Sequence, residues 1–251
     1  MKPRSKYELK LMRQSGKITA AALKKVLDNI KVGVSALDLD KLAEKEIKKL
    51  GGKLSFTTVT GYRWASCITF NEQVVHGIPT DRKLKLGDVV SIDLGVVYKG
   101  WHTDAAWSVL VGGKREKFLE VGEEALWEGI SQAIDGNTVG DISSAIQQKV
   151  EGEGYSMVRS LVGHGVGRSL HEEPEIPGYG IKGTGMLLKK GMTLAIEVIY
   201  TQGKADVLLE SDGWTISSSD GSLAGLFEMS VAVGKEKAEV LTAWPNLKII
   251  G

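Results

Sequence analysis

The sequence predicts an α+β domain built from two similar halves, and two observations lead to this fold class. The order of two helices followed by strands occurs twice along the 251 residues, at roughly 5–112 and 113–234. In addition, LKLGDVVSIDLGVVY at 84–98 aligns without gaps on LKKGMTLAIEVIY at 188–200. Such an internal repeat indicates two copies of one structural unit. No Pro-rich or Gly/Ser-rich linker separates the copies, so we expect 1–251 to form a single domain.

Two helices are predicted in each half. Apolar residues recur at helical spacing over 6–30, which predicts an amphipathic helix. A second helix is expected to begin near Ser35, whose hydroxyl can accept hydrogen bonds from the first turn, and to end at Gly51–Gly52. In the second half, the pattern predicts helices at about 114–134 and 141–152, the latter capped by Asp141.

The strand-like segments carry acidic residues at matched places. The predicted strands are 67–70, 87–97, 104–111, 156–162, 191–200, 206–210 and 227–233. A two-residue turn at Lys99–Gly100 would place Asp104 opposite Gly95, on the same face as Asp93. The repeat aligns Asp93 with Glu197, and the strand after each copy begins with an acid, Asp104 or Glu228. We therefore expect the four carboxylates to converge between the halves.

Composition excludes several classes of protein. Lys and Arg total 32 and Asp and Glu total 31, so the net charge does not favour direct binding to nucleic acid or to an anionic membrane. No segment approaches the roughly 20 apolar residues of a membrane span, and the N-terminus lacks the apolar core of a signal peptide. A single cysteine, Cys67, excludes an internal disulfide. A monomeric, cytoplasmic protein is the expectation.

Four buried carboxylates require compensating positive charge, because one unpaired buried ion costs several kcal/mol. The surrounding strands contain few Lys or Arg residues, whereas two divalent ions can be bridged by carboxylates. An imidazole ligand could come from His164 or His171, in LVGHGVGRSLHEEPEIPGYG. His102 is interpreted as a structural residue near a strand end. The GHGVGR segment also suits a phosphate-binding loop, but no capped helix follows it, which disfavours nucleotide binding.

Several motifs together resemble a known family. NEQVVHGIP, SIDLGV, WHTDAAW, GHGVG followed by HEEP, AIEV and LFEMS occur in the order and approximate spacing of type I methionine aminopeptidases. The resemblance extends from the first helix to the closing LTAWP. It implies the pita-bread fold, in which helices cover a pseudo-twofold, curved antiparallel sheet and a dinuclear metal site lies between the halves. It also implies removal of the initiator methionine from nascent proteins.

The resemblance assigns metal ligands to individual residues. The implied ligands are Asp93, Asp104, His164, Glu197 and Glu228. Asp104 and Glu228 would bridge the two ions, Asp93 would chelate one, and His164 and Glu197 would complete the other. Oxygen donors with a single imidazole suit Mn, Fe or Co, with Zn as a further option.

Roles in catalysis and substrate binding follow from the same resemblance. Hydrolysis would proceed by attack of a hydroxide held between the two ions, with Glu197 as proton acceptor. His171 would contact the scissile amide and stabilise the oxyanion, and His76 would hydrogen-bond the substrate. The implied methionine pocket consists of Phe56, Tyr62, Cys67, Leu170 and Trp214. The implied partners are peptides with an N-terminal methionine, with the ribosome exit region as a candidate contact.

The sequence also departs from the family pattern. Phe56 and Leu170 stand where the family has cysteine and phenylalanine, and Gly95 stands where a threonine is frequent. Leu226 replaces a common glutamine, and Met229–Ser230 follows Glu228 where His-Thr is usual. Gly95, Leu226 and Met229–Ser230 are expected to orient ligands and so to affect metal affinity. We expect a minimal catalytic domain without the N-terminal zinc-binding extension or the type II insertion.

Two alternative functions remain open at the level of sequence. The first is an Xaa-Pro peptidase of the same fold, which uses the same five ligands but usually carries an additional N-terminal domain. The second is a non-catalytic peptide-binding module of the same architecture. Retention of all five ligand types and of both His76 and His171 favours an enzyme.

Overall fold

The computed structural model describes residues 1–113, 116–245 and 247. Its helices are α1 (Lys6–Leu27), α2 (Ala36–Lys49), α3 (Lys117–Ser131) and α4 (Val139–Gly152), with a short 3-10 helix, η1 (Phe56–Thr58). Its strands are β1 (Lys53–Leu54), β2 (Ser66–Phe70), β3 (Gln73–Val75), β4 (Val89–Tyr98), β5 (Trp101–Leu110), β6 (Ser156–Met157), β7 (Val162–Gly165), β8 (Glu172–Pro177), β9 (Thr193–Thr201), β10 (Val207–Leu209), β11 (Ile216–Ser218), β12 (Ala224–Ala232) and β13 (Glu239–Val240).

Side-chain caps define where the helices begin. Ser5 caps α1 in a reciprocal arrangement, because its hydroxyl accepts from the Glu8 N–H and its own N–H donates to the Glu8 carboxylate. Ser35 caps α2, as predicted. The predicted cap of α4, Asp141, was wrong, because Thr138 is the capping residue. Asp141 is the third helical residue, and its carboxylate accepts from the Thr138 N–H.

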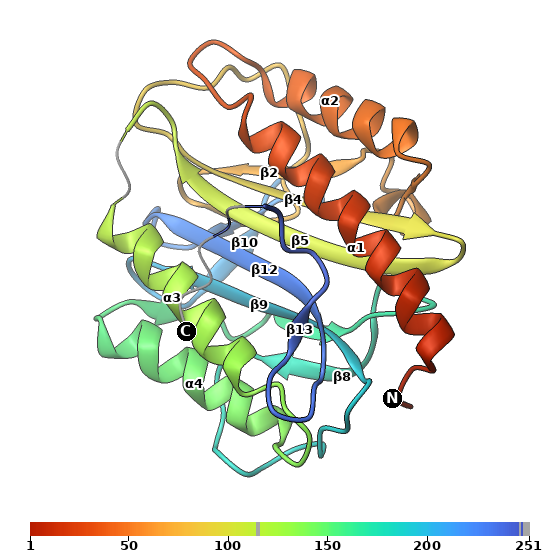
Figure 1. Ribbon diagram of the computed structural model, residues 1–251. Coiled ribbons are helices and arrows are strands. Elements are labelled where there is room, and N and C mark those ends of the chain that lie inside the picture. Colours follow the sequence, from red (N-terminus) through yellow and green to blue (C-terminus); the bar gives the residue numbers. More distant parts are fainter. Residues whose placement is uncertain (114–115, 246, 248–251) are drawn as a thin grey trace.

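The four helices cover one face of a curved antiparallel sheet (Figure 1). The main path of this ten-stranded sheet runs β1-β4-β5-β12-β9-β7-β8. Helix α1 packs on β4 and β5, and helix α3 packs on β9 and β12. A small second sheet, β10-β11-β3, lies apart from this path. The α+β class is therefore confirmed, with one helix pair on each half of the sheet.

The β4–β5 hairpin has the predicted turn and register. Lys99 and Gly100 form the two-residue turn with left-handed φ angles of 49° and 78°. Gly95 pairs with Asp104, as the sequence predicted. On the other side of β5, Ala106 pairs with Glu228 of β12, and this contact joins the two halves of the chain.

Alternation along the strands separates the core from the acidic residues. Ile92 and Leu94 are fully buried in the core formed with the helices, and Asp93 between them projects from the opposite face. In β5, Thr103 bonds Thr19 of α1 (Oγ1 to Oγ1, 2.8 Å), so the adjacent Asp104 also faces away from the helices. The helix-covered face therefore supplies stability, and the other face is free for a site.

Several element boundaries differ from the prediction. Helix α1 ends at Leu27 rather than 30, and α3 begins at Lys117, while the predicted start at 114 lies outside the described residues. The strand predicted at 156–162 was wrong, since two short strands, β6 and β7, occupy this region. Strands β1, β3, β8, β11 and β13 were not predicted. The internal repeat and the single domain stay predictions, which the matching placement of α1 on β4–β5 and α3 on β9–β12 supports.

Candidate active site

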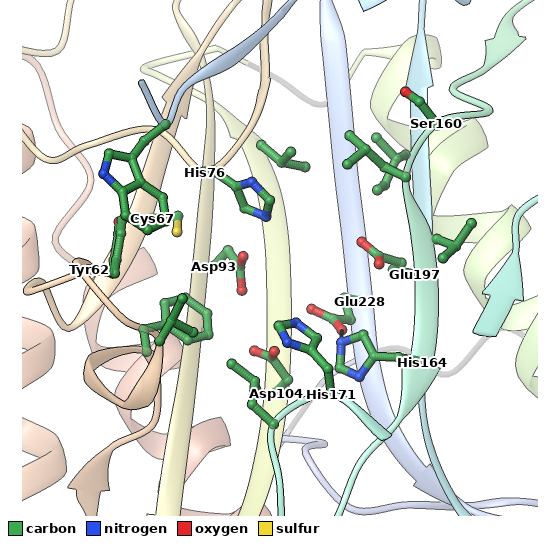
Figure 2. Close-up of a pocket in the computed structure, with 18 residues that line it drawn as sticks. Tyr62, Cys67, His76, Asp93, Asp104, Ser160, His164, His171, Glu197 and Glu228 are labelled. Carbon is green, nitrogen blue, oxygen red and sulfur yellow. Dashed lines mark ion pairs between the residues drawn. The ribbon is translucent and has the colours of Figure 1, made fainter. Parts of the chain in front are cut away.

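A cavity of about 330 Å³ lies on the face of the sheet opposite the helices (Figure 2). All twelve residues assigned to the site from sequence line it. They are Phe56, Tyr62, Cys67, His76, Asp93, Asp104, His164, Leu170, His171, Glu197, Trp214 and Glu228. The structure therefore brings every candidate residue to one place, and what each of them does there stays a prediction.

Strand register explains why the carboxylates meet. Asp93 pairs with Ala106, Ala106 pairs with Glu228, and Glu228 pairs with Glu197, so three acids share one row across β4, β5, β12 and β9. Asp104 lies two residues from Ala106 on β5 and therefore projects from the same face. In Figure 2 the four carboxylates point toward a common centre, two from each half of the chain.

His164 is oriented to act as a ligand. It lies on β7 beside β9, and its Nδ1 donates to the carbonyl oxygen of Gly165 at 2.9 Å. This bond leaves Nε2 directed into the cavity, 3.8 Å from Oε1 of Glu228. Potential ligand atoms of Asp104, His164 and Glu228 all lie within 4.8 Å of one another. The second nitrogen of a metal-binding histidine is usually fixed by such a carbonyl.

The cluster is electrostatically unfavourable by itself. Burial raises the pKa of Asp104 to about 7. Burial and repulsion from Asp104 raise the pKa of Glu197 to about 8 and that of Asp93 well above its usual range. Burial also raises the pKa of Glu228. In contrast, burial and the neighbouring His171 lower the pKa of His164 to about 4, which keeps this imidazole neutral and able to donate an electron pair.

These residues fit a site for divalent cations. Oδ1 of Asp93 and Oδ1 of Asp104 are buried without a hydrogen-bond partner among the described residues. None of the described residues that line the cavity is Lys or Arg. Buried carboxylates without partners need compensation, and carboxylate oxygens with one neutral imidazole are a donor set for divalent first-row metals.

Two further histidines border the cluster. His171 directly precedes β8, and its ring centroid is 4.4 Å from that of His164. His76 follows β3 with a left-handed φ of 59°, a conformation that few non-glycine residues adopt and that often marks functional sites. Burial lowers the pKa of both imidazoles, and His171 adds to the effect on His76. Both rings are thus neutral at neutral pH and can donate or accept hydrogen bonds.

An apolar pocket adjoins the carboxylates. Phe56, Tyr62, Cys67 and Leu170 form a buried cluster, and Trp214 packs against it. The Tyr62 ring stacks edge-on against Trp214 at 5.1 Å and against Phe56 at 6.2 Å between centroids. Cys67 pairs with Asp93 in the β2–β4 ladder, so the pocket begins directly beside the acidic row.

Sequence reasoning missed six cavity residues. They are Val59, Val75, Ser160, Leu161, Val162 and Ile199. Apart from Ser160 they are apolar, and apolar residues that line a cavity have the same sequence pattern as core residues. Ile199 could have been identified, because it lies two residues after Glu197 on the same face of β9.

The departures from the family pattern have different consequences. A Cβ at Gly95 would lie 2.8 Å from Cβ of Ser55 and 3.0 Å from Phe56, so Gly95 makes room for the Phe56 wall of the pocket. Ser230 does touch a candidate ligand residue, since its hydroxyl accepts from the Asp104 N–H and donates to the Asp104 carbonyl. Met229 lies instead in the core under the helices.

Leu226 and His102 both lie outside the cavity lining. Leu226 exchanges both of its backbone hydrogen bonds with the Ser108 hydroxyl, at the other end of the contact between β5 and β12. His102 is buried near the start of β5, outside the cavity lining, and its Nδ1 lies 2.6 Å from the Ser55 hydroxyl. His102 thus has a local structural contact, in keeping with its interpretation from sequence.

The fold and the site together are typical of a metal-dependent hydrolase, with a carboxylate–imidazole cluster beside a specificity pocket. The profile of metallopeptidase family M24 matches residues 10–234. The chain therefore belongs to metallopeptidase family M24, which confirms the family predicted from sequence.

Curated relatives and solved structures agree with this assignment. Methionine aminopeptidase 1 of Bacillus subtilis is 43% identical over 238 residues, which are 94% of this chain and 96% of that protein. Methionine aminopeptidase of Aquifex aeolicus is 39% identical over 251 residues, 95% of this chain and 97% of that protein. The crystal structure of methionine aminopeptidase from Thermotoga maritima has a TM-score of 0.95 and 41% identity, covering 97% of this chain and all of that one. The predicted pita-bread fold is confirmed.

The rival enzyme class is similar to this chain in fold. Prolidase from Pyrococcus furiosus has a TM-score of 0.78 and 22% identity. This chain covers 66% of the prolidase chain, compared with complete coverage of the Thermotoga maritima structure.

Proposed function

We propose that the protein removes the N-terminal methionine from newly made proteins by metal-dependent hydrolysis. The observation that carries the proposal is the placement of a buried carboxylate–imidazole cluster directly beside an aromatic, sulfur-containing pocket in one cavity. The predicted aminopeptidase class is confirmed by family membership and by curated relatives that are methionine aminopeptidases over most of the chain.

Two divalent ions would be held by the five cluster residues. Asp93 would bind one ion, His164 and Glu197 the other, and Asp104 and Glu228 both. The two unpartnered Oδ1 atoms and the neutral His164 support this assignment. Mn, Fe and Co suit a donor set rich in oxygen, and Zn is a further option. When bound, the ions would lower the pKa of water and so supply the nucleophile at neutral pH.

The residues around the cluster would move protons and hold the substrate. Glu197, with a pKa raised by burial and by Asp104, is suited to accept a proton and to return it to the leaving amine. His171 would donate a hydrogen bond to the carbonyl oxygen as charge develops there, and His76 would bond the substrate amide. Both imidazoles border the cluster and line the cavity.

The pocket would select methionine. The edges of the Phe56, Tyr62 and Trp214 rings and the Cys67 sulfur surround a space suited to an unbranched thioether, for which sulfur–aromatic contacts are favourable. Leu170, which directly precedes His171 in the chain, belongs to the same apolar cluster. Because the pocket adjoins Asp93, a side chain bound there would bring its own backbone to the cluster.

Cellular context belongs to the same proposal. We propose a cytoplasmic monomer that meets nascent chains near the ribosome exit. Within the described part of the chain, no helix has the length and apolarity needed to cross a bilayer. The almost balanced charge of the chain gives no reason to expect direct binding to nucleic acid.

A pair of peptides tests the proposed function. Protein loaded separately with Mn, Fe, Co or Zn is incubated with Met-Ala-Ser and with Ala-Pro-Ser. We expect release of free methionine from the first peptide and no cleavage of the second. Cleavage of the proline peptide alone would identify the Xaa-Pro class instead. Absence of cleavage with every metal, together with binding of Met-Ala-Ser, would identify a peptide-binding module.

A further inference from the structure

We propose that Arg4 is a positioning residue for His171. Arg4 belongs to the N-terminal arm, residues 1–5, which precedes α1. His171 ends the histidine loop, residues 166–171, which connects β7 to β8. The inference rests on the proposed function, in which His171 contacts the scissile amide. Arg4 would act at a distance, by holding the histidine loop through Glu172.

The histidine loop delivers neighbouring cavity residues from a short stretch of chain. His164 lies on β7 just before the loop, and Leu170 and His171 form its end. The loop has no strand partners of its own along 166–171, so its shape depends on individual hydrogen bonds. Among these, the Gly167 carbonyl accepts from the His102 N–H at 2.7 Å.

The Glu172 carboxylate is the main side-chain contact that closes the loop. Its Oε1 accepts from the backbone N–H of Arg168 at 2.6 Å and from that of Ser169 at 3.0 Å. Its Oε2 forms an ion pair with Arg4. Since Glu172 directly follows His171, one carboxylate fixes the loop backbone on one side and the N-terminal arm on the other.

Arg4 itself is held at several points. Its Nε donates to Oγ1 of Thr193 at 3.1 Å, and Nη2 reaches the Val166 carbonyl at 3.3 Å as well as Glu172. Its backbone N–H donates to the Gly191 carbonyl at 2.8 Å. The side chain is only 12% exposed. A guanidinium can serve these acceptors together because its donors form a rigid planar fork, which an ammonium group cannot reproduce.

The loop and the arm fit each other closely. The Arg4 guanidinium lies 5.3 Å from the ring centroid of Trp101, and that of Arg168 lies 4.2 Å from it, so the buried Trp101 contacts both segments. A Cβ at Gly167 would lie 2.2 Å from Nη2 of Arg4 and 2.9 Å from Oε1 of Glu172. The glycine therefore permits the approach of the arginine to the loop.

A second Arg–Glu pair provides a matched control. Arg13 of α1 pairs with Glu239 of β13, at 2.6 and 2.8 Å for its two hydrogen bonds. Like the Arg4 pair, it joins the N-terminal region to the second half of the chain. It is far more exposed, at 43% and 45%, and neither residue lines the cavity. Arg13→Met thus removes a similar interaction without touching the histidine loop.

A double-mutant cycle tests the inference on metal-loaded protein. With Arg4→Met we expect kcat to fall about tenfold, since a small misplacement of a catalytic group has effects of this size or larger. KM should change by less than about twofold, because the methionine pocket remains.

Arg4→Lys should recover part of the loss, and Arg13→Met should match wild type. In a His171→Ala background, Arg4→Met should cause no further loss. An unchanged kcat, or an equal loss in that background, would overturn the inference.

A readout without turnover separates this inference from the proposed function. The chain has four histidines, so the imidazole NMR signals of metal-free protein can be assigned with single His variants. Arg4→Met should shift the His171 signals and Arg13→Met should not. If Arg4→Met fails to fold, Glu172→Gln is used, since it keeps an acceptor for the loop but loses the charge that pairs with Arg4. An inactive wild type would reject the proposed function, whereas unshifted His171 signals would reject the role of Arg4.

Discussion

The two strand pairs that carry the acids reach the same arrangement by different connections. In the first half, β4 and β5 are joined by the turn Lys99–Gly100 and pair along their whole length. In the second half, β9 and β12 also pair along their length, but residues 202–223 separate them. This longer connection contains β10, β11 and Trp214, and Trp214 lines the cavity next to Tyr62 of the first half.

The comparison teaches that strand pairing alone positions the carboxylates. Asp93 and Asp104 belong to a tight hairpin. Glu197 and Glu228 belong to strands joined by a long connection, yet strand register places all four carboxylates on one face. The connection is therefore free to serve another purpose in the second half, where Trp214 supplies a wall of the apolar pocket beside the carboxylates. Strand register would thus determine the positions of the carboxylates, and connecting segments would supply walls of the pocket. Four variants or conditions test this difference.

The largest effect is expected at the contact between the halves. Asp104→Asn and Glu228→Gln each remove one charge from the cluster, one in each half. We expect both variants to lose metal and to lower kcat/KM by roughly a thousandfold or more, because in the proposed site these two residues would hold both ions. Metal content by elemental analysis and methionine release from Met-Ala-Ser are the measurements.

A control for these variants comes from the same strand. Ser91 lies two residues before Asp93, and its hydroxyl bonds that of Ser108 at 2.7 Å without lining the cavity. Ser91→Ala should retain metal and activity within about twofold. If Asp104→Asn kept its metal and full activity while Glu228→Gln lost them, the equivalence of the two halves would be wrong.

A smaller effect is expected at the histidine loop. His171→Ala should lower kcat by about a hundredfold, the usual effect of removing one group that stabilises an oxyanion. Metal content should stay near the wild-type value, because His171 borders the cluster while His164 is aimed into it. Steady-state kinetics with parallel metal analysis checks both points, and joint loss of metal and rate would make His171 a ligand.

The connection 202–223 predicts a more modest effect. Trp214→Ala should raise KM for Met-Ala-Ser about tenfold, because a pocket wall is removed while the carboxylate row stays intact. The selectivity for methionine over smaller first residues should fall by a similar factor. Competition between Met-Ala-Ser and Leu-Ala-Ser measures it. A loss of kcat at unchanged KM would mean that the connection also positions the cluster.

The smallest effect concerns stability without metal. The pKa of Glu197 is raised by burial to about 8 and that of Asp104 to about 7, so the folded state holds protons that the unfolded chain releases above its ordinary carboxyl pKa. Stability should therefore fall as the pH rises from the ordinary carboxyl range to about 8. We expect the Tm of chelator-treated protein to drop by roughly 5 °C or more across this window.

The matched variant for this measurement is Glu197→Gln. It removes one of the titrating groups, so its Tm should depend less on pH than that of metal-free wild type. Thermal unfolding followed by circular dichroism provides the curves. A wild-type Tm that rises with pH over the same window would contradict the assignment of raised carboxyl pKa values.

Much of the fold was predictable because it depends on local chemistry. Ser35 marked a helix start, and Lys99–Gly100 marked a turn that fixed the pairing of Gly95 with Asp104. Other elements had no such local mark. Strand β8 contains two prolines, which argue against a strand, and β3 and β11 are only three residues long. For α4, the sequence favoured Asp141 as the cap. The cap is Thr138, whose backbone N–H and hydroxyl both donate to the Asp141 carboxylate.

The site was predictable where charge or rarity marked the residues. Acids inside apolar strands and histidines in glycine-containing loops stand out from their surroundings. The four acids matched by the repeat and three such histidines, His76, His164 and His171, line the cavity. Val75 and Leu161 carry no such mark, because a pocket wall and a core have the same composition. The left-handed backbone at His76 and the approach of Arg4 to Glu172 arise from tertiary contacts that no short stretch of sequence contains.

The seam between β5 and β12 limits how this chain can change in length. Ser230 satisfies both backbone groups of Asp104, and Ser108 does the same for Leu226, so neither strand can slide along the other. One residue inserted or deleted within 89–110 would shift the strand register by one. A carboxylate would then point away from the cavity and into the hydrophobic core beneath the helices. Residues 202–223 carry no such restriction. Loop grafts aimed at new substrates should therefore be placed there and kept out of the hairpin.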